Sequence, residues 1–154
     1  MTTRARMAVF TPQRHISDSL RKQLQNAIEE LYKKHFGDQY RLQAIWLEVP
    51  SGQLYTEAKQ SSISAVSIGV RDHMDNNHRH QFMAEVFQLW MKMTGCNSHQ
   101  LMLSAPDMSE QQKALALSQQ RVRPGSRKRF GLRQLLRLCW NRVTRGHLTL
   151  SVNS

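Results

Sequence analysis

Few side chains in this 154-residue chain have the types and spacing that catalysis or metal binding requires. Three histidines, His73, His78 and His80, lie close together in the sequence. A zinc site needs three or four ligands that converge on one point. However, His78 and His80 are two residues apart on an expected helix and point to different faces. No cysteine or glutamate stands at ligand spacing beside them, so we expect solvated histidines, no metal and no cofactor.

A nucleophilic cysteine is the second candidate. Cys96 stands in an expected loop with Ser98 and His99 beside it. Catalytic partners meet in space, so their adjacency in sequence is weak evidence for a nucleophile. We therefore expect Cys96 to be an ordinary thiol. Cys96 and Cys139 are too few for a disulfide framework, which makes a reducing cytoplasm the expected location. The sequence shows no long apolar run and no apolar leader, so it predicts neither a transmembrane helix nor a secretory signal.

Charge is distributed very unevenly along the chain. The formal net charge is +11, yet residues 1–118 hold 13 basic and 11 acidic side chains, whereas residues 119–154 hold nine basic side chains and no acidic one. Within that basic arm, Arg129, Arg133 and Arg137 recur at helical spacing. The other side of the same expected helix carries an apolar stripe, formed by Leu132, Leu135, Leu136, Cys139, Trp140 and Val143.

This amphipathic segment has three interpretations. It can lie on an anionic membrane surface, hold the phosphates of a nucleic acid, or pack its apolar stripe on this domain or on a neighbouring subunit. The wide stripe with its tryptophan favours packing, but the sequence leaves all three open. We divide the chain into a domain over residues 1–118, a basic linker over 119–129 and a basic amphipathic arm over 130–154.

The elements that must position these residues follow a doubled pattern. A strand, an amphipathic helix and a second strand run from about Ala5 to Val49, and the same order returns from about Ser64 to Ser104. The first helix is expected between Ser17 and Gly37 and the second between Asp75 and Gly95, because capping residues flank each apolar stripe. Further elements are expected at 53–56, at 110–120 and in the final HLTLSV.

Two consecutive β-α-β units predict an α/β fold, called α+β in some schemes. Right-handed crossovers place both helices on one face of a four-stranded mixed sheet, which gives a doubled two-layer sandwich. The predicted strands cover 6–11, 41–49, 64–70 and 100–104. They are too apolar to leave the second face of the sheet in water, so the sequence predicts self-association through that face.

Four segments carry a resemblance to a known family: RHISDSLRKQLQNAIEELY, IWLEVPSGQLY, VSIGVRDHMDNNHR and SAPDM. Over roughly residues 5–110 the chain resembles the tautomerase superfamily, in particular its longer members related to cis-3-chloroacrylic acid dehalogenase and 4-oxalocrotonate tautomerase. The resemblance implies a trimer that transfers a proton on a small carboxylate-bearing enol or keto acid. In that family an amino-terminal proline is the base and arginines hold the carboxylate.

The chain departs from this pattern where the family does its chemistry. The second residue is Thr2, and the place of the proline falls at about Ala5. Arg71 matches the family's first carboxylate-binding arginine, while Met74 replaces the second. The resemblance therefore implies three candidate site residues, which are Arg71, Tyr32 at the place of a histidine, and Ser104 at the place of a tyrosine.

Each of these candidates also has a plain structural interpretation. Arg71 is equally a surface arginine at a strand end, and Tyr32 equally a half-buried residue that completes a helix stripe. Two functions follow from the sequence. One is a tautomerase-like enzyme in which Arg71 holds the carboxylate and the terminal amine or another group is the base. The other is a catalytically degenerate scaffold or binding module, whose basic arm contacts nucleic acid, a membrane or a partner.

Overall fold

A computed structural model describes residues 3–50, 52–120, 135–144 and 148–151. Its main sheet has the strand order β6-β5-β1-β2-β7. β1 and β2 are parallel, β5 and β6 are parallel, and β1 runs antiparallel to β5, so the sheet consists of two joined β-α-β units. The predicted doubled fold is thereby confirmed. The strands are β1 (Thr3–Pro12), β2 (Tyr40–Val49), β5 (Ser64–Ile68) and β6 (Leu101–Ser104).

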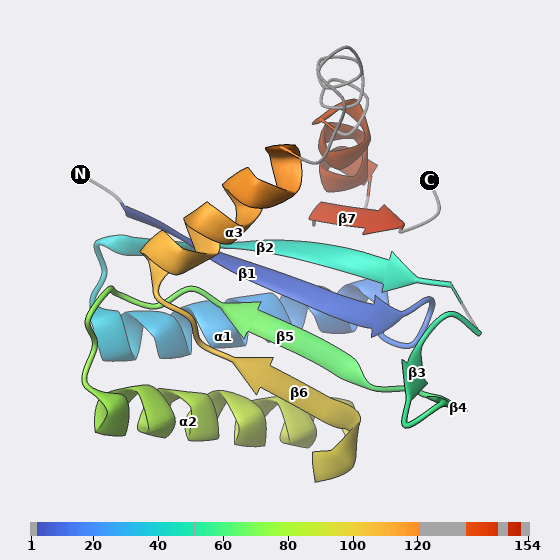
Figure 1. The fold of residues 1–154 in the computed structure, drawn as a ribbon, viewed down its shortest axis with the longest axis horizontal. Coiled ribbons are helices and arrows are strands. Elements are labelled where there is room, and N and C mark those ends of the chain that lie inside the picture. The colour runs from blue at the N-terminus through green and yellow to red at the C-terminus, as the bar shows by residue number, and fades with distance from the viewer. Residues whose placement is uncertain (1–2, 51, 121–134, 145–147, 152–154) are drawn as a thin grey trace.

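The two long helices begin and end at the predicted capping residues. α1 (Asp18–Phe36) starts where the Ser17 side chain accepts a hydrogen bond from the amide of Leu20. α2 (Asn76–Thr94) starts where Asp75 accepts one from the amide of His78, at 3.1 Å. Gly95 ends α2 in the left-handed conformation, with φ of 72°, which a residue without a Cβ adopts at little cost. Figure 1 shows both helices beneath one face of the sheet.

The core lies between these helices and the sheet. Alternate strand residues face the helices because successive side chains of a strand point to opposite faces. Trp46 of β2 and Trp90 of α2 are fully buried, with ring centroids 6.0 Å apart, so their contact joins the first β-α-β unit to the second. The other buried apolar residues at this interface include Met7, Val9, Leu24, Ile28, Leu42, Ala44, Val66, Ile68, Phe82 and Val86.

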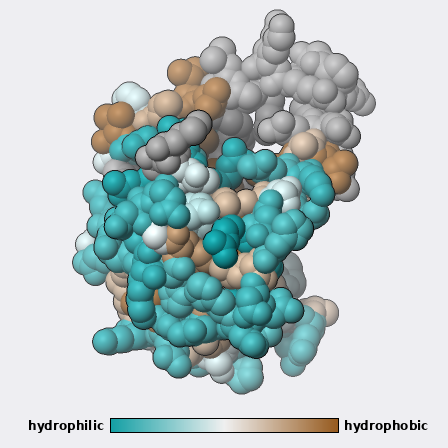
Figure 2. Space-filling model, turned by 90° about the vertical axis from the view of Figure 1, so that its left-hand side faces the viewer, coloured by the Kyte–Doolittle hydropathy of each residue, from teal (hydrophilic) through white to brown (hydrophobic). Residues whose placement is uncertain are grey.

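The second face of the sheet is only partly covered. Phe10 of β1 and Met102 of β6 remain 42% and 60% exposed on it. α3 (Met108–Gln120) leaves the sheet after β6, and its Leu117 is 60% exposed. Figure 2 shows hydrophobic side chains on the upper part of the molecule, the side on which α3 lies in Figure 1, and hydrophilic side chains over most of the lower part.

A fifth strand comes from the basic arm. β7 (Leu148–Ser151) pairs in parallel with β2, with Leu148 opposite Ile45, which confirms the strand expected in HLTLSV. Residues 135–144 are helical, as the arm's periodicity predicts. Arg129, Arg133 and most of the expected linker lie outside the described residues. Because β7 completes the sheet, the end of the arm belongs structurally to the domain.

The remaining elements are short. The hairpin expected after the turn at Gly52 consists of β3 (Tyr55–Thr56) and β4 (Lys59–Gln60), which pair with each other. A 3₁₀ turn, η1 (Ser98–Gln100), leads into β6. In the described part of the chain, no helix is both long enough and apolar enough to span a bilayer.

Candidate functional site

The residues implied by the family resemblance do not form one cluster. Arg71 follows β5 and is exposed, and Ser104 is exposed at the end of the neighbouring strand β6. Tyr32 approaches the end of β5 from α1 and is only 1% exposed. Ser104 follows Leu103, which packs against the core, so Ser104 faces the opposite side of the sheet. The sheet therefore separates Tyr32 from Ser104.

Tyr32 is held as a structural residue. Its hydroxyl donates a hydrogen bond to the carbonyl of Gly69 at 2.9 Å, and the ring packs against three other aromatic rings. Burial raises the pKa of Tyr32 far above its ordinary value near 10, and the nearby Tyr40 adds to the rise. The phenol therefore stays protonated at neutral pH and donates to a backbone acceptor.

Replacing Tyr32 with phenylalanine is expected to lower the free energy of unfolding by about 1–2 kcal/mol, because the Gly69 carbonyl loses its buried donor. The raised pKa adds a signature at high pH. Above about pH 10 the unfolded state ionises this tyrosine before the folded state does, so stability present below pH 10 is lost as pH rises. Tyr32→Phe has no such ionisable group at this position and should not show this loss of stability at high pH. Urea unfolding at neutral and alkaline pH measures both effects.

The exposed Tyr55 provides the matched control, since its side chain is 63% exposed and Tyr55→Phe should change neither quantity. A Tyr32→Phe protein with unchanged stability at both pH values would contradict the structural role of the hydroxyl.

The place of the family's proline is occupied by a buried residue near the start of a strand. Ala5 is 0% exposed and lies opposite Leu42 in the parallel ladder, two residues inside the start of β1 at Thr3. Its nitrogen belongs to a peptide bond, and an amide nitrogen is not a base near neutral pH. Within the described residues, the position that carries the catalytic amine in the family therefore holds no amine.

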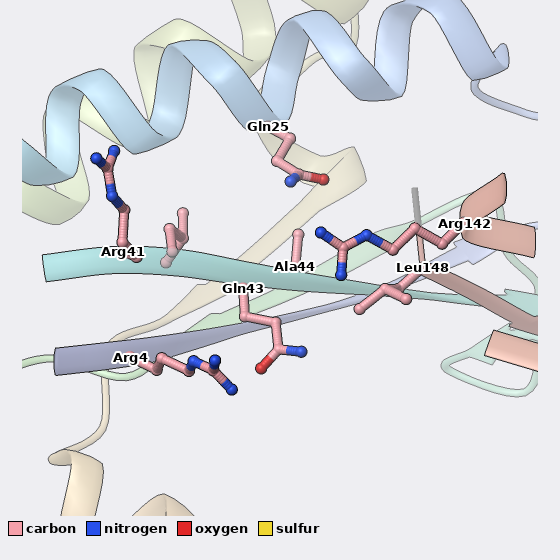
Figure 3. A pocket seen from close by; sticks show the side chains of 8 residues that line it. Arg4, Gln25, Arg41, Gln43, Ala44, Arg142 and Leu148 are labelled. Atoms are coloured by element: carbon pink, nitrogen blue, oxygen red, sulfur yellow. The ribbon is translucent and has the colours of Figure 1, made fainter. Parts of the chain in front are cut away.

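A cationic pocket of about 300 Å³ opens at the edge of β2. We call it the arginine pocket. Its polar side chains are those of Arg4, Gln25, Arg41, Gln43 and Arg142, and its apolar lining comes from Leu42, Ala44 and Leu148. Figure 3 shows these side chains arranged around the beginning of β2, with Gln25 directed toward the strand from α1.

The arginines of this pocket come from three separate elements. Arg4 of β1 stands opposite Arg41 of β2 in the parallel register. β7 pairs with β2 only from Ile45 onward, so it leaves the edge of β2 around Gln43 free of a partner strand. Arg142 belongs to the helix of residues 135–144, and its guanidinium extends toward Ala44 (Figure 3).

The pocket carries more positive charge than the surrounding acids neutralise. Glu29 of α1 lies 3.5 Å from Arg41 and partly compensates it. Elsewhere in the described residues, no carboxylate forms an ion pair with Arg4 or Arg142. Guanidinium groups bind carboxylates and phosphates through two parallel N–H donors, and glutamine amides add neutral donors. The arrangement is therefore suited to a small anion.

The sequence alone does not reveal this pocket, for identifiable reasons. Arg4 precedes the strand that was expected from Arg6 onward, so it was assigned to no element. Arg142 is about a hundred residues from Arg41, and only the pairing of β7 with β2 brings the arm to this edge. The available signal is the high proportion of arginine in residues 119–154, for which the sequence left membrane, nucleic-acid and packing interpretations open and indicated no pocket.

The remaining candidates lie apart from this pocket. His73 and His80 are exposed, and His78 is half-buried with its Nε2 3.0 Å from Nδ1 of His35. Among the described residues, no group of three or more histidine, cysteine or acidic side chains is arranged to hold a metal. Cys96 is half-buried and its amide donates to Thr94, which is consistent with an ordinary thiol.

Comparison with solved structures finds clear likenesses of fold. The native protein Ps01740 matches with a TM-score of 0.64 and 15% identity over 67% of this chain and 93% of that one. N1, a member of the cis-3-chloroacrylic acid dehalogenase family, matches at 0.63 and 10% identity over 67% and 74%. A wild-type fused 4-OT, described as a symmetric trimer, matches at 0.60 and 12% identity over 67% and 85%.

No protein-family model and no curated protein matches the sequence. The likeness is one of fold, since the identities are 15% or lower. It extends over about two thirds of the chain. This protein has the fold of the tautomerase superfamily.

Proposed function

We propose that this protein is a binding module on a tautomerase fold, and that it holds a small carboxylate or phosphate in the arginine pocket. The observation that carries the proposal is that Arg4, Arg41 and Arg142, which come from three separate elements, line one pocket. Among the described residues, Glu29 is the acid that pairs with one of these arginines. A volume of about 300 Å³ accommodates a small organic anion.

The position of Ala5 supports a binding role over proline-type catalysis. Proton transfer in the family requires a terminal amine of lowered pKa, whereas Ala5 contributes an amide inside a strand. Tyr32 is neutral and donates to Gly69, so it is no substitute base. The pocket, in contrast, needs no proton transfer to bind an anion.

The proposed module is a homo-trimer in the cytoplasm. Fused 4-OT structures of similar fold are described as trimers, and the second sheet face of this chain exposes Phe10 and Met102. Burying such apolar side chains against a second copy removes them from water. In this proposal residues 1–118 form the trimerising domain, and the arm over 130–154 supplies Arg142.

Calorimetric titration of the full chain with a tricarboxylate, a 2-oxo acid and inorganic phosphate tests the pocket. We expect saturable binding that weakens with added salt, since the contacts are ionic. Arg142→Gln should lower the affinity about tenfold or more, because a hydrogen bond to a charged group contributes about 1.5–3 kcal/mol. Arg71→Gln is the matched control and should leave the affinity unchanged, since Arg71 lies outside the pocket.

The same pair of variants separates the two functions inferred from the sequence. The second candidate is a tautomerase that acts on a small enol or keto acid, and the exposed Arg71 at the end of β5 favours it. In that case phenylenolpyruvate would ketonise faster than in buffer and Arg71→Gln would remove the activity. We expect the rate to equal the buffer blank. Turnover that depends on Arg71 but not on Arg142 would overturn the proposed function.

A further inference from the structure

The helix of residues 135–144 turns its apolar side outward. Its large apolar residues are among the most exposed in the chain: Leu135 60%, Leu136 64%, Trp140 71% and Val143 84%. Cys139, on the same side, is also exposed. We call these five residues the outer stripe. At 3.6 residues per turn they occupy one continuous face of the helix.

The opposite side of the same helix faces the protein. Arg137, Leu138 and Asn141 are half-buried, and Arg142 contributes to the arginine pocket at the edge of β2. β7 follows the helix in the chain and pairs with β2, which is consistent with Arg142 lying at the edge of β2. In an ordinary amphipathic helix of a globular protein the apolar side faces the core. Here the half-buried side holds Arg137, Leu138 and Asn141, whereas the outer stripe is exposed.

Charge indicates what kind of surface covers the outer stripe. Residues 119–154 hold nine basic side chains and no acidic one, whereas residues 1–118 have 13 basic and 11 acidic side chains. The body of a second copy is therefore nearly neutral to slightly basic and does not supply the complementary negative charge. A negatively charged partner is favoured by the arm as a whole.

The outer stripe also distinguishes between anionic partners. Nucleic-acid phosphates are bound by exposed arginine and lysine, and Leu136 or Val143 contributes nothing to such contacts. An anionic lipid surface binds both an apolar stripe and basic side chains. The apolar side chains and the tryptophan enter the headgroup region, and the basic side chains neutralise the lipids. We propose that the outer stripe docks this protein on an anionic lipid surface. The proposal is independent of the ligand of the arginine pocket.

The three tryptophans give the test a direct readout. Trp46 and Trp90 are 0% and 1% exposed, whereas Trp140 is 71% exposed, so a change in fluorescence on binding reports mainly on Trp140. The full chain is mixed with vesicles of phosphatidylcholine alone or of phosphatidylcholine with phosphatidylglycerol. We expect sedimentation with the mixed vesicles only, a blue shift of emission, and weakening of both by salt.

Variants assign the effect to the outer stripe. Leu136→Asp and, separately, Val143→Asp should lower partitioning to mixed vesicles about tenfold or more, and both residues are so exposed that the fold is retained. Leu117→Asp on α3 is the matched control, because Leu117 is also 60% exposed but lies outside the arm. It should bind vesicles like the unsubstituted protein.

Four results would overturn the proposal. They are no sedimentation with mixed vesicles, equal loss of binding in Leu117→Asp, a blue shift on raising protein concentration without lipid, and a blue shift with duplex DNA in place of vesicles. The third result would assign the outer stripe to a second copy of this chain, and the fourth would assign it to nucleic acid.

Discussion

Glu48→Ala is expected to lower the free energy of unfolding by about 3 kcal/mol, although Glu48 lies in neither candidate site. Its carboxylate accepts a hydrogen bond of 2.6 Å from Arg21, whose side chain is 1% exposed and lies over the ring of Trp46. Removing one partner of a buried ion pair leaves an uncompensated charge, which costs about 3–5 kcal/mol. We expect the lower end because Asp18 remains 3.8 Å from the guanidinium.

Two further proteins make this result interpretable. Glu30→Ala removes the exposed ion pair between Lys33 and Glu30, so the free energy of unfolding should change by less than about 0.5 kcal/mol. Replacing both buried partners, with Arg21→Met and Glu48→Leu, should recover most of the loss because no buried charge is left. Urea unfolding at neutral pH measures all three. Equal stabilities of Glu48→Ala and Glu30→Ala would show that the buried pair is not important to the fold.

Trp90→Ala is expected to destabilise the protein by about 3–5 kcal/mol, the range for removing a large aromatic side chain from a core. Trp90 is 1% exposed and its ring stacks on that of Trp46 at 6.0 Å between centroids. The pair connects α2 of the second unit to β2 of the first, so its loss weakens the contact between the two halves of the doubled fold.

The exposed Trp140 supplies the matched control for this substitution. Trp140→Ala removes the same side chain from a position that is 71% exposed and should change stability by less than about 0.5 kcal/mol. Urea unfolding followed by far-ultraviolet circular dichroism is the measurement, because the signal does not depend on tryptophan. If both variants lost the same stability, the core position of Trp90 would be contradicted.

The contact between Arg21 and Glu48 also affects the arginine pocket. Arg21 and Glu48 join α1 to β2, and the pocket lies between the same two elements, with Gln25 on the helix and Arg41 on the strand. A variant that loosens α1 from β2 is therefore expected to weaken anion binding as a secondary effect. For this reason the pocket is tested with exposed arginines rather than with the buried pair.

The doubled β-α-β fold follows from local features of the sequence. Helix periodicity is local, and the caps that end each helix, such as Ser17 and Gly95, act within a few residues of themselves. Strand length and apolar content are equally local, which is why the four predicted strands formed the mixed sheet with both helices beneath it. The family resemblance rested on the same local order, and the structural likeness to N1 and to fused 4-OT agrees with it.

The positions of the candidate functional residues depend on tertiary contacts. Strand alternation turned Ser104 away from the face of the sheet on which α1 places Tyr32, although the resemblance had grouped the two residues. Parallel pairing of β7 with β2 brought the basic arm to the edge of β2, where Arg142 and Arg41 line the same pocket. The rotation of the helix over residues 135–144 placed its apolar side in water. Each of these outcomes depends on contacts between residues far apart in the chain, and spacing along a single sequence carries no information about such contacts.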